Sequence, residues 1–409
     1  MYLFLTSFSA AFIILGLLTD SLSNILMGLV KIIVEPDILI TDYIAVGGLG
    51  AAFFNAGALM LISTLILYLL QREIGGISIS AVFLMGSFGL FGKNLLNVWP
   101  LILGVYLYAK MRREKFHDHI YAAFFSTSIA PIVSEILFIS DLKVWVKLPL
   151  CILVGASIGF LVPIVSKHLF HVHEGFSLYN TGFSVGIIGT VYVSFFKLHG
   201  YAVENRLIWS TDYQITLAVF LATLFSLMLI TGFFLNGMSL NLRQITSHSG
   251  RLNTDFIALN GFAPVLINMA LNGFISMAYV LLVGGPLNGP TIGGILTIVG
   301  FGGFGKHIKN IIPIFLGVYL GSLIPMWDLD SPSTLLVALF GTSLSPIAGH
   351  YGWFYGILAS IINSAVVLNL SILHGGMNLY NTGFSSGIVA AFLIPILNHL
   401  VKKKAVDLT

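Results

Sequence analysis

Two lysines at equivalent positions are the residues most able to do chemistry in this sequence. Lys93 and Lys306 each follow a glycine inside an apolar run, and the next residue is Asn94 or His307. Ionisable groups within a membrane span are costly and usually face the protein interior or a water-filled cavity. We therefore predict two cationic or hydrogen-bonding groups near a polar or anionic solute. The alternative is that each lysine extends to the lipid headgroups.

The seven residues LYNTGFS occur twice, at 178–184 and 379–385. The side-chain oxygens of Asn180, Thr181, Asn381 and Thr382, together with carbonyls freed by irregular backbone, would suit Na⁺ or a polar solute. The alternative is that each motif caps the N-terminus of a helix. We take the four residues as candidate ligands.

A third repeated motif places a Thr-Ser pair shortly before a proline. Proline removes one helix hydrogen bond and kinks the segment, which frees a carbonyl one turn earlier. A binding site or hinge is predicted here, with a packed kink as the alternative. The residues are Thr127, Ser128 and Pro131 in the first half, and Thr342, Ser343 and Pro346 in the second.

Other polar residues within apolar segments are weaker candidates for a functional role. Asn55 and Asn268 are expected to form hydrogen bonds across helices rather than to bind a ligand. Glu135 and Asp20 either carry a proton or pack against hydroxyls. The group His168, His171, His173 and Glu174 is interpreted as an interfacial loop rather than a metal site, because only His173 has a counterpart, His374, in the second half.

No catalytic set is recognisable in this sequence. The single cysteine, Cys151, excludes an intrachain disulfide, and neither HExxH nor GxSxG occurs. An enzyme is therefore not expected, and no cofactor is expected other than Na⁺ or H⁺ as a coupling ion.

The repeated motifs belong to a duplication of the whole chain. MGSFGLFGKNLLNVWPLILGVY at 85–106 returns as IVGFGGFGKHIKNIIPIFLGVY at 298–319, and four such blocks recur in the same order. We predict two membrane repeats, residues 1–200 and 213–400. Each repeat has five long apolar segments, namely 3–30, 43–70, 119–140, 146–167 and 177–196, then 215–236, 257–283, 332–349, 353–373 and 378–398.

Each repeat also has a pair of short apolar segments, 77–92 with 95–110 and 290–305 with 308–326. An arm of about 16 residues rises about 24 Å, less than the roughly 30 Å hydrocarbon core. The pairs are therefore predicted to be re-entrant helical hairpins with Lys93 and Lys306 at their tips. Two full crossings are the alternative.

Composition fixes the class of protein. The chain is 57% hydrophobic and only 9% charged, whereas a soluble domain has about 25% charged residues. The sequence therefore predicts an all-α, multi-pass protein of the cell (inner) membrane, whose first partner is the lipid bilayer. The formal net charge of +3 argues against nucleic acid, and a homodimer is one expected assembly.

The distribution of charge predicts opposite orientations for the two repeats. The loop 110–119 is the most basic internal loop, whereas its counterpart 326–332 has two Asp and no Lys or Arg. Because cytoplasmic loops collect Lys and Arg, the two loops are expected on opposite sides, with both termini cytoplasmic. Lys31 is the main exception. A parallel duplication would need six net crossings per repeat, which the charge pattern does not support.

The FGK and LYNTGFS motifs in two copies resemble an uncharacterised family of bacterial membrane proteins, known as a domain of unknown function. A weaker resemblance is to elevator-type sodium-coupled carboxylate transporters, which have inverted halves with glycine-rich hairpin tips. Gly302-Gly303-Phe304-Gly305 is similar to such a tip, and Gly89-Leu90-Phe91-Gly92 departs from it at one glycine. A lysine after the tip is not part of that pattern. Bacterial urea channels also have inverted halves, but their motif order differs.

Inverted repeats are typical of secondary transporters with a binding site at the repeat interface near the midplane. We therefore predict a cation-coupled secondary transporter for a small polar or anionic solute. A passive channel for a small solute such as urea is the alternative, and an intramembrane enzyme is a third hypothesis.

Overall fold

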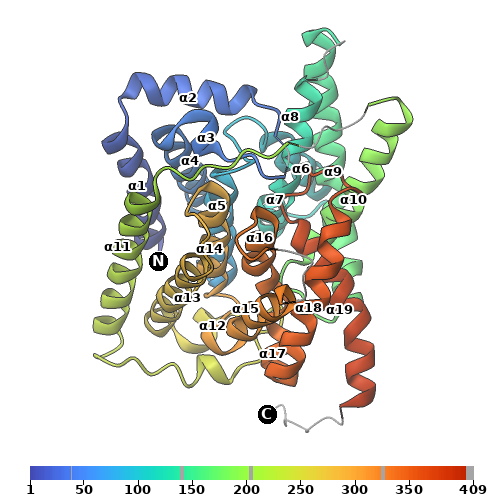
Figure 1. Cartoon of the computed structure of the whole chain (residues 1–409). Helices are drawn as coiled ribbons and strands as arrows, with labels where there is room; N and C mark the ends of the chain where they lie inside the picture. Colours follow the sequence, from blue (N-terminus) through green and yellow to red (C-terminus); the bar gives the residue numbers. More distant parts are fainter. Residues whose placement is uncertain (38, 139–141, 202–205, 324–327, 402–409) are drawn as a thin grey trace.

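The computed structural model describes residues 1–37, 39–138, 142–201, 206–323 and 328–401. This part of the chain is helical and contains no β-strand (Figure 1). In chain order the helices are α1 Tyr2–Thr19, α2 Leu22–Val34, α3 Tyr43–Gly47, α4 Leu49–Leu69, α5 Gly76–Gly89, α6 Trp99–Arg112, α7 Phe116–Ser126, η1 Thr127–Ile129, α8 Pro131–Phe138, α9 Val144–His173, α10 Asn180–Leu198, α11 Gln214–Leu235, η2 Ile245–Ser247, α12 Phe256–Asn260, α13 Phe262–Leu282, α14 Gly289–Phe301, α15 Ile308–Ser322, α16 Pro332–Gly341, η3 Thr342–Leu344, α17 Ser345–Tyr351, α18 Trp353–Leu370 and α19 Asn381–Leu400.

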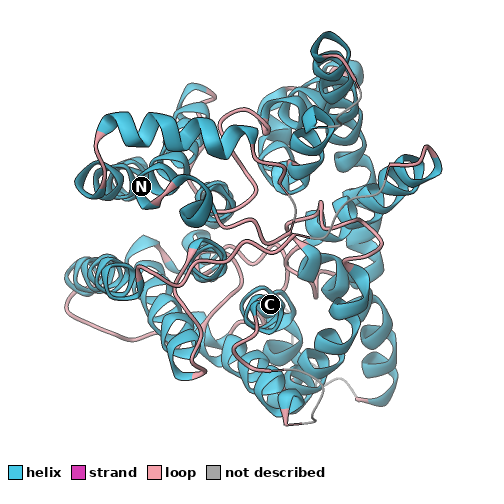
Figure 2. Ribbon diagram, turned by 45° about the horizontal axis from the view of Figure 1, so that its top comes forward, coloured by secondary structure: helices cyan, strands magenta, loops and turns pink. Residues whose placement is uncertain are grey.

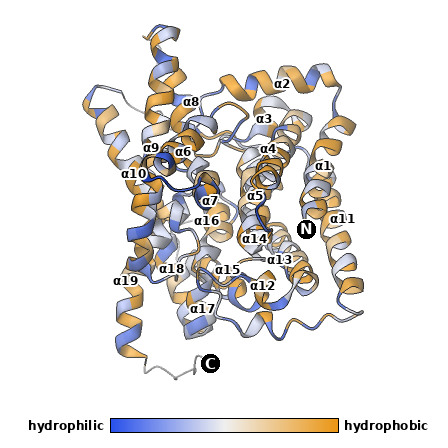
Figure 3. Ribbon diagram, turned by 180° about the vertical axis from the view of Figure 1, so that it is seen from behind, coloured by the Kyte–Doolittle hydropathy of each residue, from blue (hydrophilic) through white to orange (hydrophobic). Residues whose placement is uncertain are grey.

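The long apolar helices agree with a multi-pass membrane protein. Among the described residues, nine helices are long and apolar enough to cross a bilayer, and a tenth span forms if the bent pair α7–α8 is counted as one. Five of these ten lie in each repeat, as the sequence predicts. Many large apolar side chains on the outer helices are exposed, and the outer helices in Figure 3 are predominantly hydrophobic. These surfaces would face lipid.

Three of the predicted segments are broken in ways that the hydropathy did not reveal. The predicted span 3–30 is two helices, because α1 ends at Thr19 and the Ser21 side chain caps α2. Helix α2 then lies across one end of the molecule instead of continuing through it (Figure 1). The segments 43–70 and 257–283 each begin with a separate five-residue helix, α3 or α12, that ends before Gly48 or Gly261.

The Thr-Ser-x-x-Pro motifs interrupt the α-helices where kinks are predicted. Residues 127–129 and 342–344 are single 3-10 turns, after which α8 and α17 begin. In the first repeat the two sides of this break are bent by 46°. The motif thus interrupts one span in each repeat at the same place.

The helices form two bundles, and each repeat contributes to both. The first bundle contains α1, α4, α5, α11, α13 and α14, whereas the second contains α6 to α10 and α15 to α19. They lie on the left and right of Figure 1, and loops cross between helices in the middle of Figure 2. The arms of each short pair splay apart: α5 packs on α4 and α14, whereas α6 packs on α9 and α7. The lysines at the tips therefore lie where the chain passes between bundles.

The two repeats run in opposite directions. Helices α5 and α14 are equivalent and pack antiparallel, since Gly76 at the start of α5 lies against Gly303, and Gly289 at the start of α14 lies against Leu90. The basic loop lies at the Gly76 end, where His117 contacts Arg72. The segment after Asp328 lies at the opposite end, because Leu335 packs on Gly285.

Both termini of the described chain lie at the same end of the molecule as the basic loop. The hydroxyl of Tyr2 donates to the carbonyl of Arg72. Near the other terminus, the hydroxyl of Tyr351, at the end of α17, donates to Asn398 in α19. The ring of Tyr351 stacks on Phe176, and the guanidinium of Arg251 also lies over the Phe176 ring. The basic residues Lys402, Lys403 and Lys404, and residues 326 and 327 of the acidic loop, lie outside the described residues.

Candidate functional site

Both tips are held by the same asparagine clamp. The Asn55 Nδ2 donates to the carbonyls of Gly89 (2.7 Å) and Lys93 (2.8 Å). In the second repeat, Asn268 Nδ2 donates to the carbonyls of Gly302 and Lys306, both at 2.8 Å. These carbonyls have lost their helical partners at the break, so the clamp satisfies them. The prediction that Asn55 and Asn268 bond across helices is confirmed.

Gly92 and Gly305 turn the chain at the tips. Their φ angles are 87° and 101°, a region that side chains with a Cβ rarely enter. A Cβ on Gly92 would also overlap Leu379 of the second repeat, and a Cβ on Gly305 would overlap Leu178 of the first. Each tip therefore packs directly against the LYNTGFS segment of the other repeat.

Lys306 is fully buried and has two hydroxyl partners. Its Nζ donates to Tyr179 at 2.5 Å and to Thr342 Oγ1 at 2.7 Å. The Nζ also lies 4.6 Å from the ring centroid of Tyr179 and 5.2 Å from that of Phe301. Aromatic ring faces attract a cation, so this site combines a lysine, two hydroxyls and two rings from both repeats.

Lys93 is equally buried but lacks those partners. Among the described residues its Nζ has one hydrogen-bond partner, the Met85 Sδ at 3.7 Å, and it lies 5.0 Å from the Phe88 ring centroid. The Thr127 Oγ1 lies 3.3 Å from the same sulfur and donates to the carbonyl of Phe124 at 2.6 Å. The hydroxyl of Tyr380, the counterpart of Tyr179, is buried and has no hydrogen-bond partner among the described residues. The repeats thus share the same groups but arrange them differently.

The LYNTGFS segments cross the repeat interface. The amide of Leu178 donates to the carbonyl of Ser343 (3.0 Å), and the amide of Leu379 donates to that of Ser128 (2.9 Å). This reciprocal pairing brings the rings of Tyr179 and Tyr380 into tilted contact, with their centroids 4.6 Å apart. The hydroxyls of Ser128 and Ser343 are buried without a partner in the described structure.

The asparagine side chains of the repeated motif are hydrogen-bonded to histidines. His173 Nε2 contacts Asn180 Oδ1, and His374 Nε2 contacts Asn381 Oδ1, both at 2.9 Å. Helices α10 and α19 begin at Asn180 and Asn381, and no side chain caps either helix. The amide oxygens that the sequence offered as ligands are therefore already hydrogen-bonded within each repeat.

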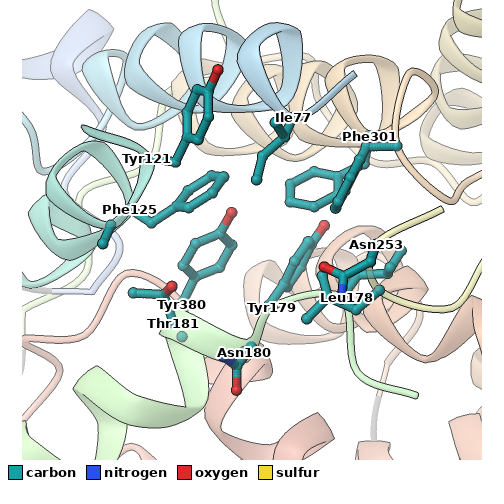
Figure 4. A pocket seen from close by; sticks show the side chains of 14 residues that line it. Ile77, Tyr121, Phe125, Leu178, Tyr179, Asn180, Thr181, Asn253, Phe301 and Tyr380 are labelled. Atoms are coloured by element: carbon teal, nitrogen blue, oxygen red, sulfur yellow. The ribbon is translucent and has the colours of Figure 1, made fainter. Parts of the chain in front are cut away.

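A cavity of about 180 Å³ lies on one side of these two tyrosines. Rings of Phe125, Tyr179, Phe301 and Tyr380 surround it, and the Asn180 side chain points away from it (Figure 4). Thr181 lines the same cavity, as do residues 252–253. Those two residues precede Asp255, whose carboxylate accepts a hydrogen bond from the amide of Gly76. The cavity therefore lies toward the same end of the molecule as the basic loop.

A second cavity, of about 80 Å³, occupies the equivalent place in the other half of the molecule. Asn381 and Thr382 line it in place of Asn180 and Thr181, and Leu39 and Ile40 replace residues 252–253. The loop with Leu39 and Ile40 leads to Asp42, which bonds to Gly289 at the opposite end from the basic loop. The four residues of the repeated motif are therefore divided between two cavities.

The residues after the lysines anchor each tip differently. Asn94 Nδ2 and Asn97 Nδ2 donate to the buried carboxylate of Asp37, as do the hydroxyls of Ser134 and Tyr43. His307 Nε2 instead contacts the carbonyl of His248 at 3.0 Å. The sequence repeat matches Asp37 with Gly250 and Tyr43 with Phe256, so the second repeat has no such carboxylate.

The duplication now accounts for the fold and for the interface at which the tips, the tyrosines and the two cavities meet. Residues 21–198 and 218–399 each match the sequence model described as "Protein of unknown function (DUF1576)". The chain belongs to this family. The family match covers both repeats, in agreement with the resemblance seen in the motifs. Comparison with curated proteins and with solved structures finds no match.

Sequence reasoning missed four residues that shape this site. Tyr179 and Tyr380 lie inside the exact repeat LYNTGFS, but the asparagine and threonine oxygens of that motif were the predicted ligands. Met85 was missed because its significance lies in a difference, since the repeat places Ile298 there. Asp37 was missed for the same reason, since the repeat places Gly250 there. Comparing the repeats position by position for chemical differences would have found the last two.

Proposed function

We propose that this multi-pass membrane protein is a secondary transporter that carries a small polar or anionic solute by alternating access. The supporting observation is the pair of cavities at equivalent places in the two inverted repeats, lying toward opposite ends of the molecule. Inverted repeats can exchange conformations, so each cavity represents the open side of one state. The inner membrane is the proposed location.

The layer between the cavities is closed by aromatic side chains. Tyr179 contacts Tyr380, and Phe88 contacts both Tyr380, at 4.8 Å between centroids, and Phe340, at 5.6 Å. A solute would pass only if the two bundles moved relative to each other. This closure favours a transporter over a continuously open channel.

The tips are the natural connections for that movement. Helices α5 and α14 are 14 and 13 residues long, which corresponds to about 20 Å and is short of the roughly 30 Å hydrocarbon core. We propose that they enter the membrane re-entrantly, and that the chain bends at Gly92 and Gly305 when the bundles move. A Na⁺ or H⁺ gradient supplies the driving force.

The test is uptake into proteoliposomes, screened over small polar and anionic solutes with and without Na⁺ and H⁺ gradients. We expect saturable uptake that depends on one ion gradient. Flux that follows the solute gradient alone and does not saturate would instead identify a channel.

Alternating access is tested separately with cysteines in each cavity. In a Cys151→Ser background, Asn253→Cys should react with an impermeant reagent from the side of residues 112–116, and Ser333→Cys from the side of residues 328–330. Substrate should change the two reactivities in opposite directions. Equal, unchanging reactivity of both positions from both sides would contradict the proposal.

A further inference from the structure

We propose that Lys93 and Tyr380 form a binding site for a small anion with a single negative charge. This inference deepens the proposed transport function by naming a ligand class. Its transport test rests on that function, whereas its binding test does not. Lys93 is fully buried and has no oxygen acceptor in the described structure.

An ammonium group in this position lacks a compensating charge. Among the described residues, no acidic side chain forms an ion pair with Lys93. A buried, unpaired charge is strongly unfavourable unless an opposite charge accompanies it. The ring of Phe88 at 5.0 Å favours a cation but supplies no negative charge.

In the second repeat, the equivalent lysine has oxygen acceptors within the protein. There the ammonium of Lys306 bonds directly to Thr342 and Tyr179. In the first repeat, the Lys93 ammonium donates to the Met85 sulfur, and the hydroxyl of Tyr380 has no partner in the described structure. The Thr127 hydroxyl lies 3.3 Å from the same sulfur but donates to the carbonyl of Phe124 at 2.6 Å. Two donors, the ammonium and the tyrosine hydroxyl, are therefore served by one weak acceptor or by none.

A thioether is a weak acceptor on a flexible side chain. An anion that displaced the Met85 sulfur would accept from the ammonium of Lys93, and the Tyr380 hydroxyl, which has no partner in the described structure, would be available as a second donor. The unpartnered Ser128 hydroxyl belongs to the residue whose carbonyl bonds to Leu379, next to Tyr380. All of these donors are neutral except Lys93.

The charge balance selects a monovalent anion. One ammonium compensates one negative charge, and a second charge would be buried without a partner, because Lys306 is already bonded to Tyr179 and Thr342. Carboxylates and halides both satisfy this chemistry. Acetate and chloride are the two probes that distinguish them, and sulfate represents divalent anions.

Binding is measured on the full-length protein in detergent, as the shift of the thermal unfolding midpoint with anion concentration at constant Na⁺. We expect a saturable rise with acetate or with chloride in the wild-type protein, because a ligand that binds only the native state raises its stability. The rise should be lost in Lys93→Met and retained in Lys143→Met, a control on an exposed lysine. Non-specific salt effects should be the same in all three proteins.

The tyrosine hydroxyl gives a second test that keeps Lys93 in place. Tyr380→Phe should weaken anion binding by about tenfold or more, because it removes a hydrogen bond to a charged ligand. If Lys93→Met retained the full saturable shift, or if sulfate produced the same Lys93-dependent shift as the monovalent anions, the proposal would be overturned.

Proteoliposome uptake separates this inference from the proposed function. Lys93-dependent binding without uptake of labelled acetate or chloride would support the anion site and count against transport of that ligand. Ion-coupled uptake of a neutral solute that Lys93→Met leaves unchanged would support transport and overturn the anion site.

Discussion

The two repeats contain the same buried lysine, tyrosine and threonine, but the hydrogen bonds of these side chains differ. In the second repeat, lysine, tyrosine and threonine are bonded to one another. In the first, the corresponding lysine contacts a methionine sulfur, the threonine donates to the carbonyl of Phe124, and the tyrosine hydroxyl has no partner in the described structure. The tips of both repeats are held by equivalent asparagines and turn at glycines with positive φ. The difference shows that duplication preserved the frame of the site while single substitutions, such as Met85 for Ile298, separated the chemistry of its halves.

A second contrast lies at the outer surface of the two tips. The first tip is bound to the carboxylate of Asp37 through four neutral donors. At the second tip a histidine contacts a backbone carbonyl. A carboxylate accepts several strong hydrogen bonds at once, so the first tip should be the more firmly held of the two.

The largest expected effect comes from removing that carboxylate. Asp37→Ala removes the carboxylate that accepts from Asn94, Ser134 and Tyr43, whereas Asn97 Nδ2 keeps the carbonyl of Gly92. We expect a loss of about 3–5 kcal/mol in the free energy of unfolding. His307→Ala, the comparison in the second repeat, removes one contact and should cost about 1 kcal/mol. Denaturation of both variants in detergent measures the difference. Equal losses would show that the two tips are held with the same strength.

The asparagine clamps test a difference between the tips at a single carbonyl. Asn55→Ala leaves the carbonyls of Gly89 and Lys93 without their side-chain donor, so it should lower the free energy of unfolding by about 1–3 kcal/mol. Asn268→Ala should cost less, because the Lys306 carbonyl also accepts from Asn272 Nδ2 at 3.1 Å and keeps that bond. An equal or larger loss from Asn268→Ala would show that the Asn272 contact does not support the second tip. The same unfolding measurement serves for both.

The lysines test where the repeats differ. Lys306→Met removes two hydrogen bonds and should destabilise the protein by about 1–2 kcal/mol. Lys93→Met removes an ammonium with no polar oxygen partner, so its unfolding free energy in the absence of small monovalent anions should be unchanged or higher. The comparison is made by unfolding each variant in sodium sulfate. A greater loss from Lys93→Met than from Lys306→Met would reverse the assignment of the two halves.

The smallest effect on stability is expected for the substitution that makes the repeats alike. Met85→Ile is nearly volume-conserving and should change the free energy of unfolding by less than about 1.5 kcal/mol. Without the sulfur, the Lys93 Nζ should approach the Thr127 Oγ1 to about 3 Å, as Lys306 approaches Thr342. A cryo-electron microscopy structure of the variant would reveal this contact. An unmoved Lys93 would show that Met85 is not what separates the two groups.

Much of the architecture follows from local properties of the sequence. The apolar segments have the length that a bilayer requires, and the charges at their ends set their direction. The Thr-Ser-x-x-Pro breaks were predictable because proline acts on its own helix. By contrast, the break at Thr19–Ser21 was not predictable from hydropathy, because α2 is itself apolar and its placement across the end of the molecule depends on packing against α3 and α4.

The sequence by itself determined which residues are duplicated, and so pointed to Lys93, Lys306 and the LYNTGFS motif. Only the tertiary structure decided what those residues touch. Asn180 and Asn381 are hydrogen-bonded to His173 and His374, whereas the rings of the adjacent tyrosines are in contact across the repeat interface. The reason is physical: a repeat records which positions are equivalent, but hydrogen-bond partners from the other repeat are set by how two inverted halves pack, and that packing is not local to either half.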